Sequence, residues 1–284
     1  MINYDALMAR DFADVERCYT EDDCILYALG LGLGDPDDPA HLRAVFEGAE
    51  GFAALPSMVN VLGNPPFWAQ DPETGITWQK ILHGEHAITL HAPLPPRASI
   101  VGRTRLTGLI DKGPGKGALI YTERTISDTD GRPLATVAST LFARADGGFG
   151  GPNGPVKPVH PLPERPPDTH FDMQSSPRAA LIYRLSGDKN PLHADPAMAR
   201  KVGFERPILH GLCTMGIAAW AIPMVLRNGD FTSLTHMQLR FSAPVYPGET
   251  IRTEIWDDGG DISFRARVLD RDAVVLNNGL ARLT

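Results

Sequence analysis

Residues 235–282, THMQLRFSAPVYPGETIRTEIWDDGGDISFRARVLDRDAVVLNNGLAR, decide the fold of the second half of the chain. Four segments of alternating or β-rich character follow one another there, separated by turn-forming Pro, Gly and Asp residues. The predicted strands cover residues 235–242, 250–256, 262–269 and 274–282. An apolar segment with helical spacing, residues 212–226, precedes them. One helix followed by an antiparallel meander is typical of an α+β fold.

The first half repeats this pattern. An apolar segment with helical spacing at residues 52–62 comes before predicted strands at residues 80–91, 99–110, 118–127 and 133–144. Short matches recur in the same order in the two halves, at offsets of 156, 152 and 151 residues: Tyr27-Ala28-Leu29 with Tyr183-Arg184-Leu185, Gly51-Phe52 with Gly203-Phe204, and Ala92-Pro93 with Ala243-Pro244. Such a duplication predicts that both halves share one fold.

A Pro/Gly-rich segment separates the halves. Residues 147–167, GGFGGPNGPVKPVHPLPERPP, suit neither a helix nor a strand interior. We predict an N-terminal half at residues 1–150, a linker at residues 151–168 and a C-terminal half at residues 169–284. A rigid surface loop within one domain is the alternative interpretation.

The composition of the 284 residues excludes several classes of protein. A formal charge of −7 leaves no basic surplus for a phosphate backbone, so nucleic-acid binding is not expected. The most apolar stretch, residues 208–226, contains polar residues and Pro223, and it is interpreted as a buried helix rather than a membrane span. The N-terminal residues do not resemble a signal peptide, and the three cysteines form no CxxC pair. We therefore expect a cytoplasmic protein.

The segment from Tyr183 to His193, YRLSGDKNPLH, is the main candidate site. Gly187 and Pro191 keep it from forming a regular helix, so that Asp188 and His193 can point at one place. An imidazole exchanges protons near neutral pH, and a nearby carboxylate can share a water with it or orient its ring. In the structural alternative, Asp188 caps a helix and His193 lies on the surface. Spacing alone leaves both interpretations open.

Gly211 lies near the start of the second apolar helix, where backbone N–H groups lack intrahelical partners. Such an N–H suits a developing oxyanion, although a glycine there also permits close packing. Cys213 follows it. No neighbouring residue indicates thiolate activation, so we expect Cys213 to be a buried structural residue.

Two further patterns have weaker interpretations. His83, His86 and His91 suggest a metal site, but strand alternation predicts His83 and Glu85 on one face and His86 on the other. We therefore expect no metal there. The loop at residues 112–117, KGPGKG, lacks the Walker spacing and is interpreted as a hairpin tip, although its two lysines can attract a nucleotide diphosphate.

These residues resemble the R-specific, type 2 enoyl-CoA hydratases of the MaoC-like dehydratase family. Residues 183–193 resemble the hydratase motif and PILHGL at residues 207–212 resembles the segment that begins the helix. The resemblance extends to the first half through YALG at 27–30, LHGE at 82–85, PLP at 93–95, DKG at 111–113 and GGFGG at 147–151.

The resemblance implies a double hot-dog fold and reversible hydration of a trans-2-enoyl-CoA to a (3R)-3-hydroxyacyl-CoA in fatty acyl-CoA metabolism such as β-oxidation. Asp188 and His193 would activate the water, Asn190 would support the site, and the Gly211 N–H would bind the thioester oxygen. Substrate contacts would map to His83, Gly84, Lys112, Lys189, Pro191, Leu192 and Phe241. The family needs no metal or other cofactor. The resemblance is compatible with a homodimer, although one chain with two hot-dogs can also complete its own sheet pairing.

The first half departs from the motif. Its corresponding stretch is GDPDDPAH at residues 34–41, in which Asp35 and His41 are six residues apart and no Asn lies between them. We therefore expect a non-catalytic first half that contributes acyl and CoA contacts. A thioesterase on the same fold, or a non-catalytic acyl-CoA-binding subunit, are the competing functions, because a fold alone does not determine chemistry.

Overall fold

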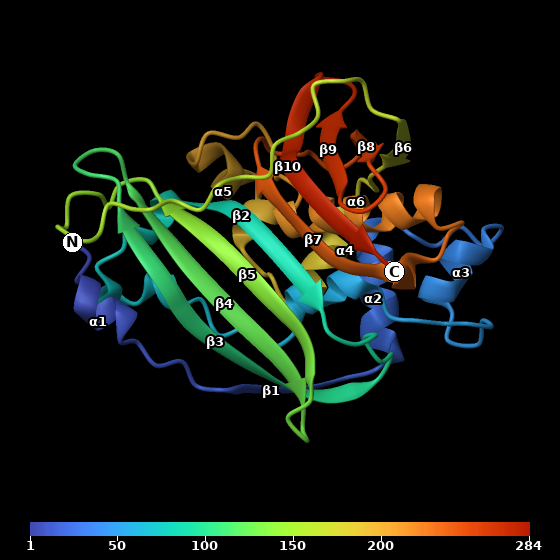
Figure 1. Ribbon diagram of the computed structural model, residues 1–284, viewed down its shortest axis with the longest axis horizontal. Helices are drawn as coiled ribbons and strands as arrows, with labels where there is room; N and C mark the ends of the chain where they lie inside the picture. Colours follow the sequence, from blue (N-terminus) through green and yellow to red (C-terminus); the bar gives the residue numbers. More distant parts are fainter.

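The computed structural model describes all 284 residues and is built on one 10-stranded antiparallel sheet. The order of the strands across the sheet is β1-β3-β4-β5-β2-β7-β10-β9-β8-β6. Their bounds are β1 (Val15–Tyr19), β2 (Ile81–Leu90), β3 (Ala98–Asp111), β4 (Ala118–Asp128), β5 (Pro133–Ala143), β6 (Thr169–Gln174), β7 (Leu234–Phe241), β8 (Thr250–Asp257), β9 (Ile262–Val268) and β10 (Ala273–Leu283). All eight strands expected from the sequence are present. The sheet lies in front of the helices in Figure 1.

The two halves have the same strand order. Numbered within each half, both follow the sequence first, third, fourth, fifth, second from the outer edge to the centre. Strands β2 and β7 meet in the middle, where Glu85 to Thr89 pair with Arg240 to His236. The predicted duplication is therefore confirmed, and the two units form one continuous sheet through their second strands.

The helices are α1 (Tyr4–Met8), α2 (Glu21–Leu31), α3 (Pro39–Val45), α4 (Ala179–Tyr183), α5 (Pro196–Lys201) and α6 (Gly211–Leu226). Short 3-10 helices are η1 (Pro56–Val61), η2 (Trp68–Gln70), η3 (Pro72–Thr74), η4 (Trp78–Lys80), η5 (Arg184–Ser186), η6 (Pro191–His193) and η7 (Phe231–Ser233). The predicted apolar helix of the second half is α6, which is buried from Cys213 to Pro223 because it is apolar on every face.

The predicted helix at residues 52–62 is wrong in type and length. Only Pro56–Val61 is helical, as the 3-10 turn η1, although every residue in it is buried. Pro56 begins the turn, as proline commonly does at the first helical position, and the buried guanidinium of Arg124 donates to the carbonyls of Val59 and Asn60 at its end. A side chain therefore bonds to both carbonyls where no further helical turn follows, in addition to the Leu62 N–H that donates to Val59.

The sequence pattern missed the edge strands β1 and β6 and the helix α2. Each edge strand is short and pairs on one side only, with β3 and β8 respectively. Helix α2 begins with a capping box between Thr20 and Asp23 and ends at Gly32, which has a φ of 102°. Its Tyr27 ring lies 5.6 Å from that of Tyr183 on α4, at an interplanar angle of 51°, so residues that match between the halves are neighbours in space.

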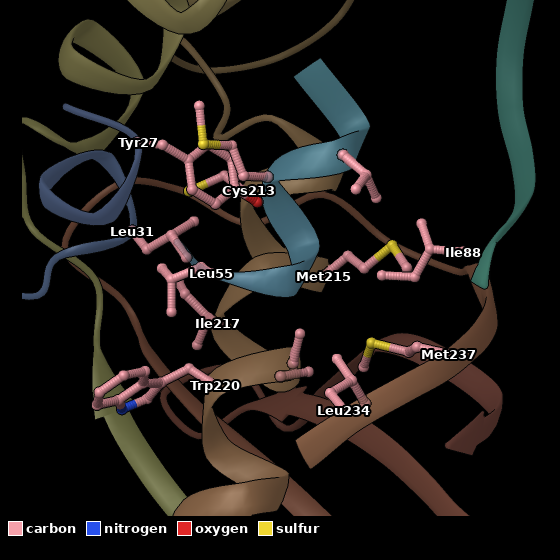
Figure 2. Packing of buried hydrophobic residues seen from close by; sticks show 14 of the residues in the cluster. Tyr27, Leu31, Leu55, Ile88, Cys213, Met215, Ile217, Trp220, Leu234 and Met237 are labelled. Carbon is pink, nitrogen blue, oxygen red and sulfur yellow. The ribbon is translucent and has the colours of Figure 1, made fainter. Parts of the chain in front are cut away.

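The main core is shared by the two halves. A cluster of 45 buried residues includes residues of α2, η1 and β2 from the first half and seven residues of α6 from the second. Figure 2 shows Tyr27, Leu31, Leu55 and Ile88 around Cys213, Met215 and Ile217 of α6. A separate cluster of nine residues lies under α1 and the far end of β3 and β4. Because the larger core draws on both halves, the fold holds them together on the helical side of the sheet as well as along β2 and β7.

No helix or strand occurs between Ala143 and Thr169. This stretch contacts both halves. The Lys157 ammonium lies 4.8 Å above the Tyr121 ring of β4, the Asn278 amide of β10 donates to the His160 carbonyl, and His160 Nε2 lies 2.8 Å from Ser263 Oγ of β9. The Pro/Gly-rich segment therefore forms a strap that contacts strands of both halves, and Figure 1 shows it passing across the sheet toward β6.

Candidate active site

The turn at residues 184–193 gives the site its shape. Asp188 Oδ1 accepts from the Asn190 N–H at 3.1 Å, and Asn190 Oδ1 accepts from the Leu192 N–H at 3.1 Å, which starts the 3-10 turn η6. Side chains of this kind commonly bond to the backbone two residues on, which tightens a turn. His193 ends η6 with its side chain buried. Asn190 is thus a structural element of the turn and helps to hold Asp188 and His193 in place.

His193 is placed as a neutral base. Its Nδ1 lies 2.8 Å from the Ile208 carbonyl oxygen, which can only accept, so Nδ1 carries the hydrogen. In the neutral ring the lone pair is therefore on Nε2. Burial lowers the pKa of His193 below its usual value, while the Ile208 carbonyl and the charge of Asp188 partly oppose that shift. The neutral form therefore persists at physiological pH, as a general base requires.

His210 is one of the site residues that the sequence did not reveal. Its ring stacks on that of His193, with centroids 3.7 Å apart and an interplanar angle of 25°. His210 Nε2 donates to the Asp188 carbonyl at 3.1 Å, and its buried Nδ1 has no partner. Burial, with the charge of His193, lowers the pKa of His210 to about 4. Its position directly before Gly211, next to the start of an apolar helix, was the available signal.

Asp188 completes the cluster. One ligand-type atom from each of Asp188, His193 and His210 lies within 4.8 Å of the others. Asp188 is exposed, whereas both imidazoles are buried. Such a group also has the spacing of a metal site, and the bonds of His193 Nδ1 and His210 Nε2 to carbonyl oxygens leave His193 Nε2 and His210 Nδ1 as lone pairs on the site side. A carboxylate beside an imidazole lone pair suits the binding of a water and the removal of its proton.

Gly211 begins α6 with no side-chain cap, so its N–H has no partner within the helix. A Cβ added there would lie 3.0 Å from Cε1 of Phe241, which is closer than ordinary van der Waals contact. The predicted oxyanion donor and the predicted substrate contact Phe241 are therefore neighbours. Glycine is needed here because of this close approach to the ring.

His83 enters the same region from the first half. Its ring lies 4.7 Å from that of Phe241, and the charge of Asp188 acts on it. The expected strand alternation is wrong at this point, because the β2–β5 register shifts between His83 and Glu85. This irregularity turns His83 and His86 to the same side, where His83 Nε2 lies 3.1 Å from His86 Nδ1. His91 lies elsewhere and pairs with Thr136.

A groove of about 260 Å³ leads away from His83. It brings together four of the predicted substrate contacts, His83, Gly84, Lys112 and Phe241. Three others, Lys189, Pro191 and Leu192, lie on the catalytic turn outside its lining. The sequence missed Lys157 of the strap and Arg240 of β7, which add cationic groups to the groove. Arg240 lies within a predicted strand, and nothing in the sequence pattern marked it as a substrate contact.

Lys112 is held at the groove by Asp111. The Asp111 carboxylate accepts from the N–H groups of Gly113, Gly148 and Gly150 at 2.7–2.8 Å, and these bonds lower its pKa. The hairpin tip at residues 112–117 is thereby tied to the glycine-rich segment at residues 147–151. The Lys112 ammonium lies 5.2 Å from the Phe142 ring centre. An exposed cation is thus fixed at the outer part of the groove.

The counterpart turn in the first half is arranged differently. His41 Nδ1 accepts from the N–H groups of Gly34 and Asp35, and its ring contacts Trp220 edge-on at 5.3 Å. Cys213 also has a structural environment, since its buried thiol donates to the Gly30 carbonyl and burial raises its pKa. Both observations favour packing roles for these residues.

Comparison with known proteins identifies the family. Residues 18–145 match the MFE-2 hydratase 2 N-terminal domain and residues 158–278 match the MaoC like domain. The chain is 39% identical to the enoyl-CoA hydratase ChsH3 of Mycobacterium tuberculosis, over 98% of each chain. It is 36% identical to the peroxisomal enoyl-CoA hydratase 2 of Arabidopsis thaliana, over 96% of this chain and 93% of that one.

The solved structures give the same result. A MaoC-like dehydratase from Phytophthora capsici superposes with a TM-score of 0.87 at 35% identity, covering 100% of this chain and 99% of that one. The peroxisomal multifunctional enzyme type 2 of Drosophila melanogaster superposes with a TM-score of 0.82 at 33% identity, over 95% of this chain and 48% of that one. The chain therefore belongs to the MaoC-like dehydratase family and has its double hot-dog fold.

Proposed function

We propose that the protein catalyses reversible R-specific hydration of trans-2-enoyl-CoA to (3R)-3-hydroxyacyl-CoA in fatty acyl-CoA metabolism. The observation that carries the proposal is the His193 lone pair on Nε2, held beside the Asp188 carboxylate and near the free N–H of Gly211. The names of the relatives support the same reaction.

The geometry supports a direct mechanism. Asp188 and His193 hold a water, and His193 Nε2 accepts its proton as the oxygen bonds to C3 of the enoyl group. The electrons of the C2–C3 double bond shift toward the thioester oxygen, where the Gly211 N–H stabilises the developing negative charge. The Asp188–His193 pair then returns a proton to C2, so that one water is added and no group is lost. The residues that act on the water come from this chain.

The groove supports CoA recognition. An acidic protein needs local cations to meet the CoA phosphates, and Lys112 supplies one at the outer part of the groove. Lys157 and Arg240 extend the positive surface there, although Arg240 also pairs with Glu85 at 3.3 Å. His83, Gly84 and Phe241 lie between these cations and Gly211, where the pantetheine arm would run. CoA recognition accordingly draws on the first half, the strap and β7, whereas the second half carries out the chemistry.

The test is a spectrophotometric assay with trans-2-enoyl-CoA substrates of increasing length. Loss of the enoyl thioester absorbance without release of free thiol, followed by predominantly 3R product on chiral analysis, is the expected result. Release of free CoA would instead identify a thioesterase. Predominantly 3S product would refute the stereochemical part of the proposal.

We also propose a cytoplasmic homodimer. The three cysteines are free, which suits a reducing compartment. No helix has both the length and the apolar character needed to span a bilayer. Light scattering of the purified protein tests the dimer, and fractionation of the source cells tests the compartment. A monomer by light scattering would contradict the oligomeric state only.

A further inference from the structure

A chain of buried polar side chains leads from the core of the first half to His83. His86 Nε2 lies 2.8 Å from Asn60 Oδ1, and His86 Nδ1 lies 3.1 Å from His83 Nε2. Asn60 and His86 are 2% and 4% exposed. Buried polar groups of this kind are costly unless each has a partner, so the chain constrains every hydrogen position within it.

The hydrogen positions follow from Asn60. Its Nδ2 donates to Met215 Sδ at 3.7 Å, so its Oδ1 faces His86 and can only accept. His86 Nε2 must therefore carry the hydrogen. Because the ring is neutral, with a pKa well below its usual value through burial and the charges of His83 and Arg124, His86 Nδ1 has the lone pair. His83 Nε2 must then donate to it, since two lone pairs would otherwise face each other.

The backbone around Asn60 is fixed. Arg124 Nη2 donates to the carbonyls of Val59 and Asn60 at 3.1 and 3.3 Å, and Asn64 Nδ2 donates to the Asn60 carbonyl at 2.9 Å. The Ser139 hydroxyl lies 2.9 Å from His86 Nδ1 and is a second donor to the same lone pair. Every group that faces His86 therefore supports one arrangement of hydrogens.

We propose that Asn60 and His86 are positioning residues that set His83 as the Nε2–H tautomer, leaving its Nδ1 as a hydrogen-bond acceptor for the pantetheine arm of the substrate. The inference rests on the proposed function and names a contact within it. His83 lines the groove between Lys112 and Phe241, which is the path from the phosphates to the thioester. The pantetheine arm contains amide N–H groups, and each needs an acceptor when it leaves water.

The first test reads the tautomer directly. In protein labelled with [15N]histidine, the His83 resonances are assigned by comparison with His83→Asn. We expect Nε2 to be protonated and Nδ1 to be free in the wild type. Acetyl-CoA, which cannot be hydrated, should shift the Nδ1 resonance toward a hydrogen-bonded value, whereas adenosine 3′,5′-bisphosphate, which lacks the pantetheine arm, should not. A protonated Nδ1, or no response to acetyl-CoA, would overturn the proposal.

The second test separates hydrogen bonding from packing. A glutamine at position 86 can donate to Asn60 through its amide and accept from His83 through its oxygen, whereas leucine can do neither. We expect His86→Leu and Asn60→Leu to raise KM by roughly five- to tenfold, as expected for one lost hydrogen bond, with kcat changed less than threefold. His86→Gln should stay within about twofold of wild type. Equal effects of His86→Gln and His86→Leu on KM would show that His86 acts by packing alone.

The outcomes remain distinguishable from failure of the proposed function. A wild-type protein that binds acetyl-CoA through His83 but does not hydrate enoyl-CoA refutes the reaction and leaves the positioning chain intact. If the wild-type protein is a hydratase and the His83 tautomer is the same in His86→Leu as in the wild type, only the positioning role of His86 and Asn60 is refuted. Thermal unfolding of each variant shows whether it is folded. If the leucine variants are not folded, KM and the His83 tautomer measured in His86→Gln still test the proposal.

Discussion

The two halves share a strand order but differ in what they place beneath the sheet. The second half has the 16-residue helix α6, whose first N–H groups face the site, whereas the first half has only the six-residue turn η1. Both halves bring a pair of histidines to the same region, and all of them except the half-buried His83 are buried. In the first half, His83 and His86 are joined edge to edge by a hydrogen bond, and in the second, His193 and His210 stack.

This difference shows how a duplicated fold divides one task. In the second half His193 keeps its Nε2 lone pair free for a water, while in the first half His41 uses Nδ1 to accept two backbone N–H groups. In the proposed mechanism, the same kind of side chain thus serves chemistry in one turn and loop structure in the other. The sheet is common to both halves, and the distinction between them lies in the turns that precede the inner helices.

The largest effect is expected at the catalytic turn. Asp188→Asn and His193→Ala should each lower kcat by about 10²-fold or more, because each removes a group that acts on the water. Asp35→Asn in the first half is the matched control and should stay near wild type. Steady-state kinetics with one substrate, and circular dichroism to establish folding, make the comparison. Near wild-type turnover in either second-half variant would remove the proposed mechanism.

The next effect concerns stability and pH. His83 lies in the first half and His210 in the second, and the pKa of each is lowered to about 4. Below about pH 6.5 the folded protein therefore binds fewer protons than the unfolded chain. Their contribution is present above that pH and is lost as the pH falls toward 4. At pH 5 the loss is roughly 2 kcal/mol for each group at most.

Urea denaturation at pH 7.5 and 5 measures this loss. His83→Gln and His210→Gln should each reduce the pH dependence of the unfolding free energy by a similar share. A reduction in only one of the two variants would show that the halves are not equivalent in this respect.

The preferred acyl chain length of the substrate tests whether the acyl tail binds under the strands of the first half. If the acyl tail lies beside residues 52–62, kcat/KM should rise from the four-carbon substrate toward medium or longer ones, since each buried CH₂ contributes about 0.8 kcal/mol. Val59→Leu should shift the preference to shorter chains, while Ala219→Val in α6 should leave it unchanged. A strict preference for the four-carbon substrate, unaltered in a folded Val59→Leu variant, would limit the first half to stability and CoA contact.

The smallest effect is expected at the outer groove. Lys112→Ala should raise KM several-fold at low salt and less at high salt, because an exposed charge contact contributes only about 1 kcal/mol and is screened. Lys201→Ala, at an exposed lysine that ends α5 outside the groove lining, is the control. A large kcat loss with unchanged KM would give Lys112 another role.

The sequence predicted the meander because each strand is bounded by turn residues, such as the segments at 246–248 and 257–260. The helix α6 was predictable from an uninterrupted apolar segment. The edge strands β1 and β6 were not, since each is short and pairs on one side only. The turn η1 was also missed in type, because its buried Arg124 cap comes from a strand distant in sequence.

The site was predictable where one segment carries it, as with Asp188, Asn190 and His193. His210 and His86 act through neighbours that only folding brings near, a stacked ring in one instance and Asn60 in the other. The side of His83 depended on the register shift in β2, which strand alternation does not reveal. Contacts between distant segments therefore account for what the pattern left out.

The strap that connects the halves determines how assembly of the site depends on protein concentration. The proposed site takes His83 from one half and His193 from the other, and two separate chains would form it only at concentrations above their dissociation constant. A covalent connection of this kind replaces that requirement with an effective concentration on the order of millimolar. Assembly of the site from its two halves is then an intramolecular event whose extent does not change when the protein is scarce.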